Sequence, residues 1–301
     1  MVDQIVPEFL LKRINNQYGN VLSEEIIKGF LTSRKSSFRV NTIKSSIDEV
    51  EQIIKENHIL FEKVSFFSLA YIIDFEDEKK IRGLSIYEEG KIYFQSLSSM
   101  LPPLYLNIDE KSHILDMAAA PGGKTTEMAA LSNNKACITA CELNPLRAEK
   151  LKYNIDKQGA SKVTVMVSDA RKLDEFFRFD RILLDAPCSG SGTLSLSNEK
   201  TFVYFTEKLI EKSSKTQFLL LKKAINALKK GGILIYSTCS ILKEENEEVL
   251  SRALKGEKCH IEPITIKEEG LELLPSTIEG VITVMPNAKY EGFFLAKIIK
   301  D

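Results

Sequence analysis

The chain has 301 residues, 44% of them hydrophobic, so it can bury the core of one large domain or of two modest ones. Its 41 basic and 42 acidic side chains give a net charge of −1, so a nucleic-acid partner would have to bind at a local basic patch. The five cysteines fit neither a disulfide framework nor a zinc pattern, and we expect reduced thiols and no metal. Early acidic residues and the lack of a long apolar run predict a cytoplasmic protein without a membrane segment.

The first part of the chain mixes helical and strand-like patterns. Helices are expected over 8–19, 23–31 and 46–57. Between the second and third lies SRKSSFRVNTIK, an apolar-alternating strand whose cations include Arg34, Lys35, Arg39 and Lys44. These side chains would suit a surface that follows a phosphate backbone. A solvated strand edge is the alternative, and the pattern alone slightly favours it.

A connecting segment follows, and it contains two groups of structure-shaping residues. Gln95, Ser98 and Ser99 are expected to cap a helix or to line a ligand pocket. Pro102 and Pro103 are expected to shape a helix end or the entry into the next domain.

A strand, a tight loop and the start of a helix are predicted over 113–131, where an apolar run ends on Asp116 and Pro-Gly-Gly precedes Lys124. Such a junction directs backbone N–H groups and a helix dipole at a ligand. The Walker A and G-x-G-x-x-G patterns both fail, because Ala118 and Ala120 occupy positions where glycine is needed. Small residues with one acid suit S-adenosylmethionine, and a loop without any ligand is an equal alternative at this point.

Two further predicted strands also end at acidic residues. The strand over 136–141 ends before Glu142, which could accept hydrogen bonds from ribose hydroxyls. The strand over 163–167 ends near Asp169, which could meet an adenine amine. Each carboxylate alone is more often a cap or turn residue, but three at successive strand ends favour a nucleoside site.

Two cysteines follow the fourth and fifth strands. The strand over 179–184 leads into DAPCSGSGT, with Asp185 and Cys188, and a later strand ends in STCSI, with Cys239. Both thiols are expected at the carboxyl edge of the sheet, beside the cofactor. A thiolate that adds to carbon 6 of a pyrimidine makes carbon 5 able to attack a sulfonium methyl group. One such cysteine would be interpreted as core packing, whereas two favour pyrimidine chemistry.

The end of the chain carries two simpler patterns. The acidic segment KEENEEV after the second thiol predicts a solvated helix start, because negative charge is favourable in a first turn. Strand-like segments over 281–285 and 293–299 predict an added antiparallel edge.

At these motifs the chain resembles the RsmB/Nop/Sun family of RNA cytosine-5 methyltransferases. The strong matches are DMAAAPGGKTT, DAPCSGSGT and YSTCS, and FRVNT, IYFQSLSSM and EGFFLAK extend the likeness more weakly over the whole chain. The resemblance implies a class I methyltransferase fold, an α/β, mostly parallel doubly wound sheet of seven strands with one antiparallel strand. It predicts an α+β RNA-recognition domain over 1–87, a connecting segment over 88–112 and the methyltransferase domain over 113–301.

The resemblance also assigns roles. It makes Cys239 the nucleophile and gives Cys188 the release of product, while Asp185 contacts the target cytosine and Lys124 lies near it. The residues expected around S-adenosylmethionine are Asp116, Ala118, Ala119, Ala120, Pro121, Gly122, Gly123, Lys124, Glu142, Arg147, Asp169, Ala170 and Asp185. The residues expected to contact RNA are Arg34, Lys35, Arg39 and Asn41. Glu291 departs from the family pattern, in which Asp is frequent before Gly-Phe-Phe.

The predicted reaction is transfer of a methyl group from S-adenosylmethionine to carbon 5 of a cytidine in structured RNA, through a covalent cysteine–cytosine intermediate. Ribosomal RNA is the first choice of substrate and transfer RNA the second, and a monomer is expected. One alternative is a non-catalytic RNA-binding or ribosome-assembly factor on the same fold, which the presence of both thiols and of Asp185 argues against. Another is a DNA or protein methyltransferase, and Cys239 disfavours it because DNA cytosine enzymes are expected to attack from the P-C motif.

Overall fold

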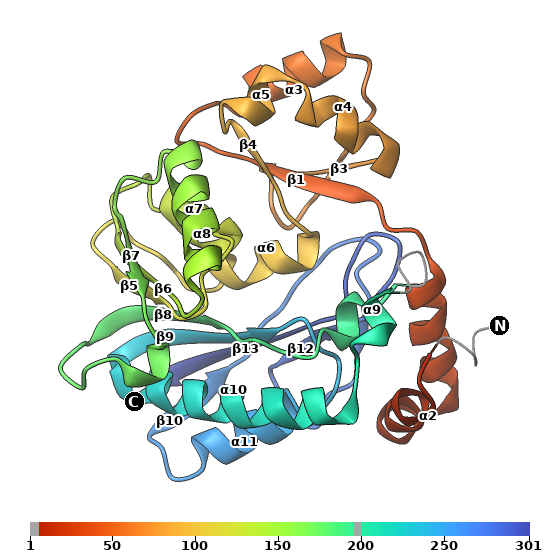
Figure 1. Ribbon diagram of the computed structural model, residues 1–301, viewed down its shortest axis with the longest axis vertical. Coiled ribbons are helices and arrows are strands. Elements are labelled where there is room, and N and C mark those ends of the chain that lie inside the picture. The colour runs from red at the N-terminus through yellow and green to blue at the C-terminus, as the bar shows by residue number, and fades with distance from the viewer. Residues whose placement is uncertain (1–5, 196–199) are drawn as a thin grey trace.

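The computed structural model describes residues 6–195 and 200–301. Within these ranges the chain forms a four-stranded sheet, in the order β2-β3-β1-β4, and a nine-stranded sheet. The order of the large sheet is β11-β12-β13-β9-β8-β5-β6-β7, and β10 pairs with β13. Figure 1 shows the small sheet and its helices stacked beyond one face of the large sheet, with α6 between them.

The strands are β1 (Ser36–Val40), β2 (Glu62–Lys63), β3 (Ala70–Ile73), β4 (Ile92–Phe94), β5 (His113–Asp116), β6 (Cys137–Glu142), β7 (Val163–Val167), β8 (Phe179–Asp185), β9 (Leu228–Thr238), β10 (Cys259–Glu262), β11 (Leu273–Leu274), β12 (Ile282–Val284) and β13 (Phe293–Lys300). The α-helices are α2 (Glu8–Leu31), α3 (Ile47–Glu56), α4 (Glu78–Arg82), α5 (Ser85–Glu88), α6 (Leu97–Leu104), α7 (Gly123–Leu131), α8 (Pro145–Gln158), α9 (Lys200–Val203), α10 (Glu207–Ala227) and α11 (Glu247–Leu254). Three 3₁₀ turns are η1 (Phe75–Asp77), η2 (Ala170–Lys172) and η3 (Ser191–Thr193).

The large sheet has a parallel centre and an antiparallel flank. Strands β5 to β9 pair in parallel, and β13 runs antiparallel to β9. The described ranges give nine strands where seven were expected, because β11 extends the sheet beyond β12 and β10 pairs with β13. The mostly parallel centre with an antiparallel neighbour agrees with the predicted architecture.

Helices cover both faces of the large sheet, so the middle positions of its central strands are apolar on both sides. Along β5, Ile114 packs with α6, α7 and α8, whereas Leu115 packs with α10 and α11. Both residues are fully buried. A continuous apolar run of this kind is typical of a parallel strand that is covered on both sides.

The bounds of α8 and the start of α7 follow from the local sequence. α8 begins after Asn144, whose side chain accepts hydrogen bonds from the next backbone N–H groups, and it ends at Gly159 with φ 72°. α7 begins after Gly122, whose φ of 110° suits glycine. A Cβ at this position would also lie 3.0 Å from Leu151 of α8. The Pro-Gly-Gly turn is therefore dictated by both backbone and packing.

The N-terminal region packs in two places. The helices expected over 8–19 and 23–31 are joined as α2, which is kinked at Gly19, where φ is 77°. The apolar face of α2 packs against residues of the large unit, including Phe202 and Ile241. The small sheet instead has a core of its own with α3, and β4, which lies within 88–112, pairs with β1. Within the described ranges, no helix has the length and apolar character that a membrane span would need.

Candidate active site

The carboxyl ends of the parallel strands gather the residues singled out in the sequence. Asp116 ends β5, Glu142 ends β6 and Asp185 ends β8. Asp116 is in register with Leu183 of β8, two residues before Asp185. Because neighbouring parallel strands end at one edge, these three carboxylates lie at the same side of the sheet.

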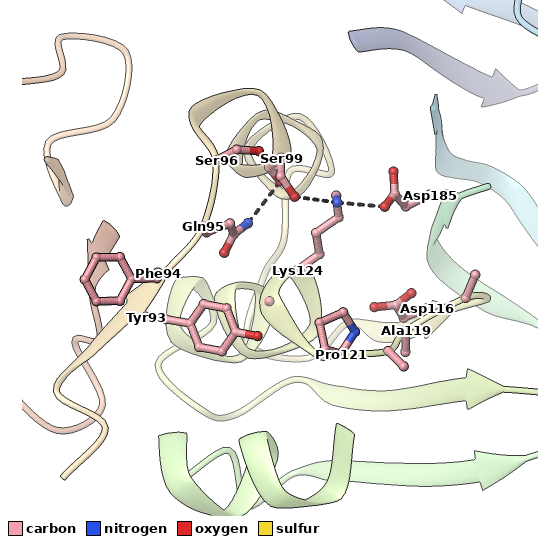
Figure 2. Close-up of a pocket in the computed structure, with 13 residues that line it drawn as sticks. Tyr93, Phe94, Gln95, Ser96, Ser99, Asp116, Ala119, Pro121, Lys124 and Asp185 are labelled. Atoms are coloured by element: carbon pink, nitrogen blue, oxygen red, sulfur yellow. Dashed lines mark hydrogen bonds and ion pairs between the residues drawn. The ribbon is translucent and has the colours of Figure 1, made fainter. Parts of the chain in front are cut away.

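A cavity of about 210 Å³ opens at this edge, between the small sheet and the loop after β5 (Figure 2). Lys124 projects into it from the first turn of α7 and donates to Ser99 Oγ at 2.6 Å and to Asp185 Oδ2 at 2.7 Å. The other Asp185 oxygen accepts from Ser237 Oγ at 2.8 Å. Burial alone would lower the pKa of Lys124, but the charge of Asp185 raises it above its usual value. The cavity therefore contains a fixed ammonium–carboxylate pair.

Asp116 lines the same cavity with one oxygen available. Its Oδ2 accepts from Thr125 Oγ1 at 2.7 Å, whereas the buried Oδ1 meets no well-aligned donor in the described part of the chain. Burial raises the pKa of this carboxyl group to about 6. A buried acceptor without a partner is costly, so a donor from a ligand would be favourable here.

A second cavity, of about 230 Å³, lies on the other side of the loop and shares Ala118 with the first. Its lining is formed by Met117, Ala118, Glu142, Leu143, Asn144, Arg147, Ser168, Asp169, Ala170, Arg171, Pro187, Thr216 and Leu220. Glu142 accepts from Asn144 N at 2.8 Å, and Arg147 Nη2 donates to Ala120 O at 2.7 Å. Arg171 forms an ion pair with Asp169 at 2.7 Å and holds the pKa of that carboxyl group below its usual value. All of the predicted cofactor residues except Gly122 therefore line one of two adjoining hollows, whereas Gly122 packs against Leu151 of α8.

The two thiols follow β8 and β9 and face each other. Cys188 Sγ and Cys239 Sγ lie 2.8 Å apart. The hydrogen bond with Cys239, followed by burial and the charges of Glu245 and Asp185, raises the pKa of Cys188 well above its usual value. Cys188 is therefore a protonated thiol at neutral pH, and its S–H can donate to Cys239. Neither thiol belongs to the lining of the two cavities, but the neighbouring Asp185 lines the first.

KEENEEV begins a helix as predicted, since α11 starts at Glu247, but the prediction that this start is solvated is wrong for residues 245–247. Glu245 and Asn246 are fully buried, and Glu247 is 4% exposed. Ser189 and Ser240, which directly follow the two cysteines, donate to Glu245, and Gln217 donates to it as well. These contacts replace the water that an acidic run would otherwise need, and the small hydroxyl residues beside both cysteines were the signal that could have indicated them.

Two of the four residues predicted to contact RNA are interior residues. Arg39 is 1% exposed and donates to Gln95, Gly123 and Thr126, so it joins the small sheet to the loop before α7. Asn41 is fully buried, and its amide donates to the Gly90 and Gln158 carbonyls. The burial of both side chains contradicts the predicted RNA contacts of Arg39 and Asn41.

The other two predicted RNA-contacting residues lie nearer the surface. Arg34 donates to three carbonyl groups of the loop that follows Cys188, those of residues 192–194. Lys35 forms an ion pair with Glu62 at 2.6 Å. Arg34, Lys35 and Lys289 line a hollow of about 260 Å³ that adjoins the first cavity through residues 94–96. Glu78 and Glu291 line the same hollow, and Lys35 and Lys289 both pair with Glu62, so the cations around it are partly neutralised.

Residues 6–195 and 200–301 contain no group of three His, Cys, Asp or Glu side chains placed to hold a metal ion. The site combines two thiols, one ammonium–carboxylate pair and two adjoining hollows.

Comparison with known proteins identifies the family of the chain. The family model described as 16S rRNA methyltransferase RsmB/F matches residues 103–299. Ribosomal RNA small subunit methyltransferase F of Shewanella sp. (strain ANA-3) is 32% identical over 305 residues, which cover 96% of this chain and 63% of that protein. The protein of the same name from Aliivibrio salmonicida is 33% identical over 306 residues, covering 98% and 64%. The chain thus spans slightly less than two thirds of the length of these relatives.

Solved structures give the same result for the fold. A methyltransferase homolog protein from Pyrococcus horikoshii superimposes with a TM-score of 0.84 and 31% identity, over 98% of this chain and 95% of that one. The structure described as NSun6 from Pyrococcus horikoshii with SFG has a TM-score of 0.85 at 24% identity, covers 98% of each chain and supports the fold alone. The predicted class I fold and the family resemblance are confirmed: the chain belongs to the RsmB/F family of methyltransferases.

Proposed function

We propose that the protein transfers a methyl group from S-adenosylmethionine to carbon 5 of a cytidine in ribosomal RNA. The observation that carries the proposal is the pair of thiols 2.8 Å apart, beside the Lys124–Asp185 ion pair. Methylation of a pyrimidine at carbon 5 needs a thiol nucleophile and a group that holds the base. Ribosomal RNA is the substrate that the names of the relatives specify, and transfer RNA is the second choice.

The residues of both cavities fit S-adenosylmethionine. Its sulfonium supplies an electrophilic methyl group. The unpartnered oxygen of Asp116 would accept from the amino group of the methionine part, and the carboxylate of Glu142 would accept from the ribose hydroxyls. Leu143 and Leu220 provide apolar surface for the adenine. Because every proposed group comes from one chain, we propose a monomeric enzyme.

Lys124 and Asp185 would orient the target base. Their ion pair presents a cation and a carboxylate to a cavity at the end of β8. The carboxylate of Asp185 can accept from the exocyclic amine of cytosine, which distinguishes it from uracil. Lys124 can donate to a ring acceptor and draw electron density from carbon 6, where the nucleophile must add.

Cys239 is the proposed nucleophile, as the family likeness implies. Its thiolate forms a bond to carbon 6, and the electron pair of the 5,6 double bond would form the bond from carbon 5 to the methyl group as the methyl–sulfonium bond breaks and S-adenosylhomocysteine leaves. Cys188 lies 2.8 Å from Cys239, so a Cys188 thiolate, formed by loss of its proton to solvent, would lie beside the adduct. Cys188 then removes the proton from carbon 5; the C–H electron pair restores the double bond, and the C–S bond breaks to return the Cys239 thiolate.

The test uses two variants with opposite outcomes. Cys239→Ala should abolish methyl transfer and leave no covalent protein–RNA complex, whereas Cys188→Ala should accumulate that complex. Transcripts of small-subunit ribosomal RNA and of transfer RNA, each read by bisulfite sequencing, identify the substrate. Full activity of Cys239→Ala would refute the assignment, and failure of the wild type to bind S-adenosylmethionine would favour a non-catalytic RNA-binding factor.

For RNA recognition we propose the region over 1–87, with the connecting segment over 88–112 placing it beside the methyltransferase domain over 113–301. The supporting observation is the hollow with Arg34, Lys35 and Lys289, which adjoins the active-site cavity. Cations around such an opening would contact the phosphates that flank the target nucleotide.

A further inference from the structure

Glu245 connects the two cysteine loops through a single buried carboxylate. Its Oε1 accepts from Ser189 N at 2.7 Å, and its Oε2 accepts from Ser189 Oγ at 2.5 Å and from Ser240 Oγ at 2.6 Å. Ser189 directly follows Cys188, and Ser240 directly follows Cys239. One rigid group therefore sets the position of both loops relative to each other.

The surroundings hold this carboxylate in place. Gln217 Nε2 donates to Glu245 at 3.3 Å and also to the carbonyl of Pro187 at 3.1 Å, so it supports the Cys188 loop from α10. Tyr236 donates to the backbone carbonyl of Glu245 at 2.5 Å. Burial raises the pKa of Glu245, while hydrogen bonds from Ser189 and Ser240 oppose that rise. Every contact of the carboxylate is directed at keeping the two loops together.

We propose that Glu245 is a positioning residue for the release step, which it serves by fixing Cys188 against Cys239. The proposal rests on the function proposed above. The carboxylate binds the N–H that follows Cys188, so it fixes the backbone from which that thiol projects. Further along, the loop is also joined to the Cys239 loop by Gly192 N, which donates to Cys239 O at 3.0 Å, and by Ser191 Oγ, which lies 2.8 Å from Ser240 Oγ. Glu245 adds the contact at Ser189, the residue directly beside Cys188. Proton transfer tolerates little displacement of the two partners.

Packing alone does not account for a carboxylate at this place. Buried charged groups contribute little to stability compared with apolar residues of similar volume. A matched control is available two residues away: Glu247 is also buried, begins α11 and accepts from Ser276 Oγ at 2.8 Å. Glu247→Ala thus removes a buried carboxylate from the same segment. The side chain of Glu247 contacts Ser276 and not the serines beside the thiols.

The experiment compares Glu245→Ala, Glu245→Gln and Glu247→Ala with the wild type and with Cys188→Ala. Turnover on RNA, the fraction of protein trapped as covalent protein–RNA complex, and the melting temperature are measured for each. Glu245→Ala should lower turnover about 10- to 100-fold and accumulate the complex, as Cys188→Ala does. Glu245→Gln should stay near wild type, because the amide oxygen can accept from Ser189 N and the serine hydroxyls can turn to accept from the amide N–H. Glu247→Ala should change the melting temperature alone.

A double variant tests whether Glu245 acts through Cys188. Adding Glu245→Ala to Cys188→Ala should lower turnover no further than Cys188→Ala does by itself. If Glu245→Ala does not fold, Ser189→Ala takes its place. The fraction of this variant trapped as covalent complex should be larger than for the wild type and smaller than for Cys188→Ala. A variant with reduced turnover but no more trapped complex than the wild type would overturn the proposal. Trapping by Cys188→Ala and not by Glu245→Ala refutes this inference alone, whereas no methyl transfer by the wild type refutes the proposed function.

Discussion

Arg39 joins the small sheet to the loop before α7, and replacing it with Met should weaken that junction while keeping most of its volume. The guanidinium donates to Gln95 at 3.0 Å and to Thr126 at 2.8 Å, and it lies 3.8 Å from the carboxylate of Glu127. Arg39 and Glu127 are both 1% exposed. At a pH above the pKa of Glu127, where both members are charged, removing one member of such a buried ion pair costs about 3–5 kcal/mol. Against a typical total of about 5–15 kcal/mol, we expect a clear loss in the free energy of unfolding.

The size of this loss should depend on pH through Glu127. Burial raises the pKa of Glu127 from 4.5 to about 8, and the charge of Arg39 limits the rise. The folded chain therefore keeps a proton that the unfolded chain gives up, so this group's contribution to stability is complete below pH 4.5 and is lost as the pH rises through about 8. Without Arg39 the folded pKa of Glu127 rises further, and stability keeps falling at higher pH. The penalty of Arg39→Met should thus be larger at about pH 9 than at about pH 6.

Urea unfolding at both pH values measures the penalty. The same substitution in a Glu127→Gln background is the control, because an amide cannot titrate and the penalty should then be the same at both pH values. A penalty below about 1 kcal/mol, or one with the same pH dependence in both backgrounds, would refute the reasoning.

Three further predictions concern the site itself. Glu142→Ala should weaken binding of S-adenosylmethionine about tenfold by calorimetry, because a polar contact of the second cavity is lost, whereas Glu149→Ala on the exposed side of α8 should leave affinity unchanged. Lys124→Met should lower methyl transfer about 100-fold, because the cation beside Asp185 is removed. Affinity for the cofactor should stay within about threefold of the wild type. Unchanged methyl transfer would exclude Lys124 from the chemistry. Lys35→Glu should weaken RNA binding and make the slope of log affinity against log salt concentration shallower by about one or two. An unchanged slope would show that Lys35 does not contact RNA.

The positions at the strand ends could be predicted from the sequence. Asp116, Glu142 and Asp185 each follow a short apolar run, and turn residues mark where each run ends. Parallel strands bring their carboxyl ends together whatever the details of packing. The roles of the two thiols came from the family likeness alone, since the local patterns around both are similar.

Burial of polar residues could not be predicted, because it depends on partners far along the chain. Glu245 meets Ser189 across 56 residues, and Arg39 meets Thr126 across 87. A local pattern rich in charge indicates solvent unless such partners are known. The same reasoning explains the error for Asn41, whose amide bonds to the carbonyl of Gln158 across 117 residues.

The packing of α2 has a consequence for recombination between relatives. Leu10 and Ile26 of this helix lie in one apolar cluster with Phe202 and Ile241, whereas the next element, β1, belongs to the small sheet. On the other side, α6 packs into the core of the large sheet through Met100. The small sheet is thus an insert whose two ends both return to the same larger body. A chimera intended to exchange RNA preference should therefore swap the segment from β1 to β4 as a cassette and retain the host's own α2.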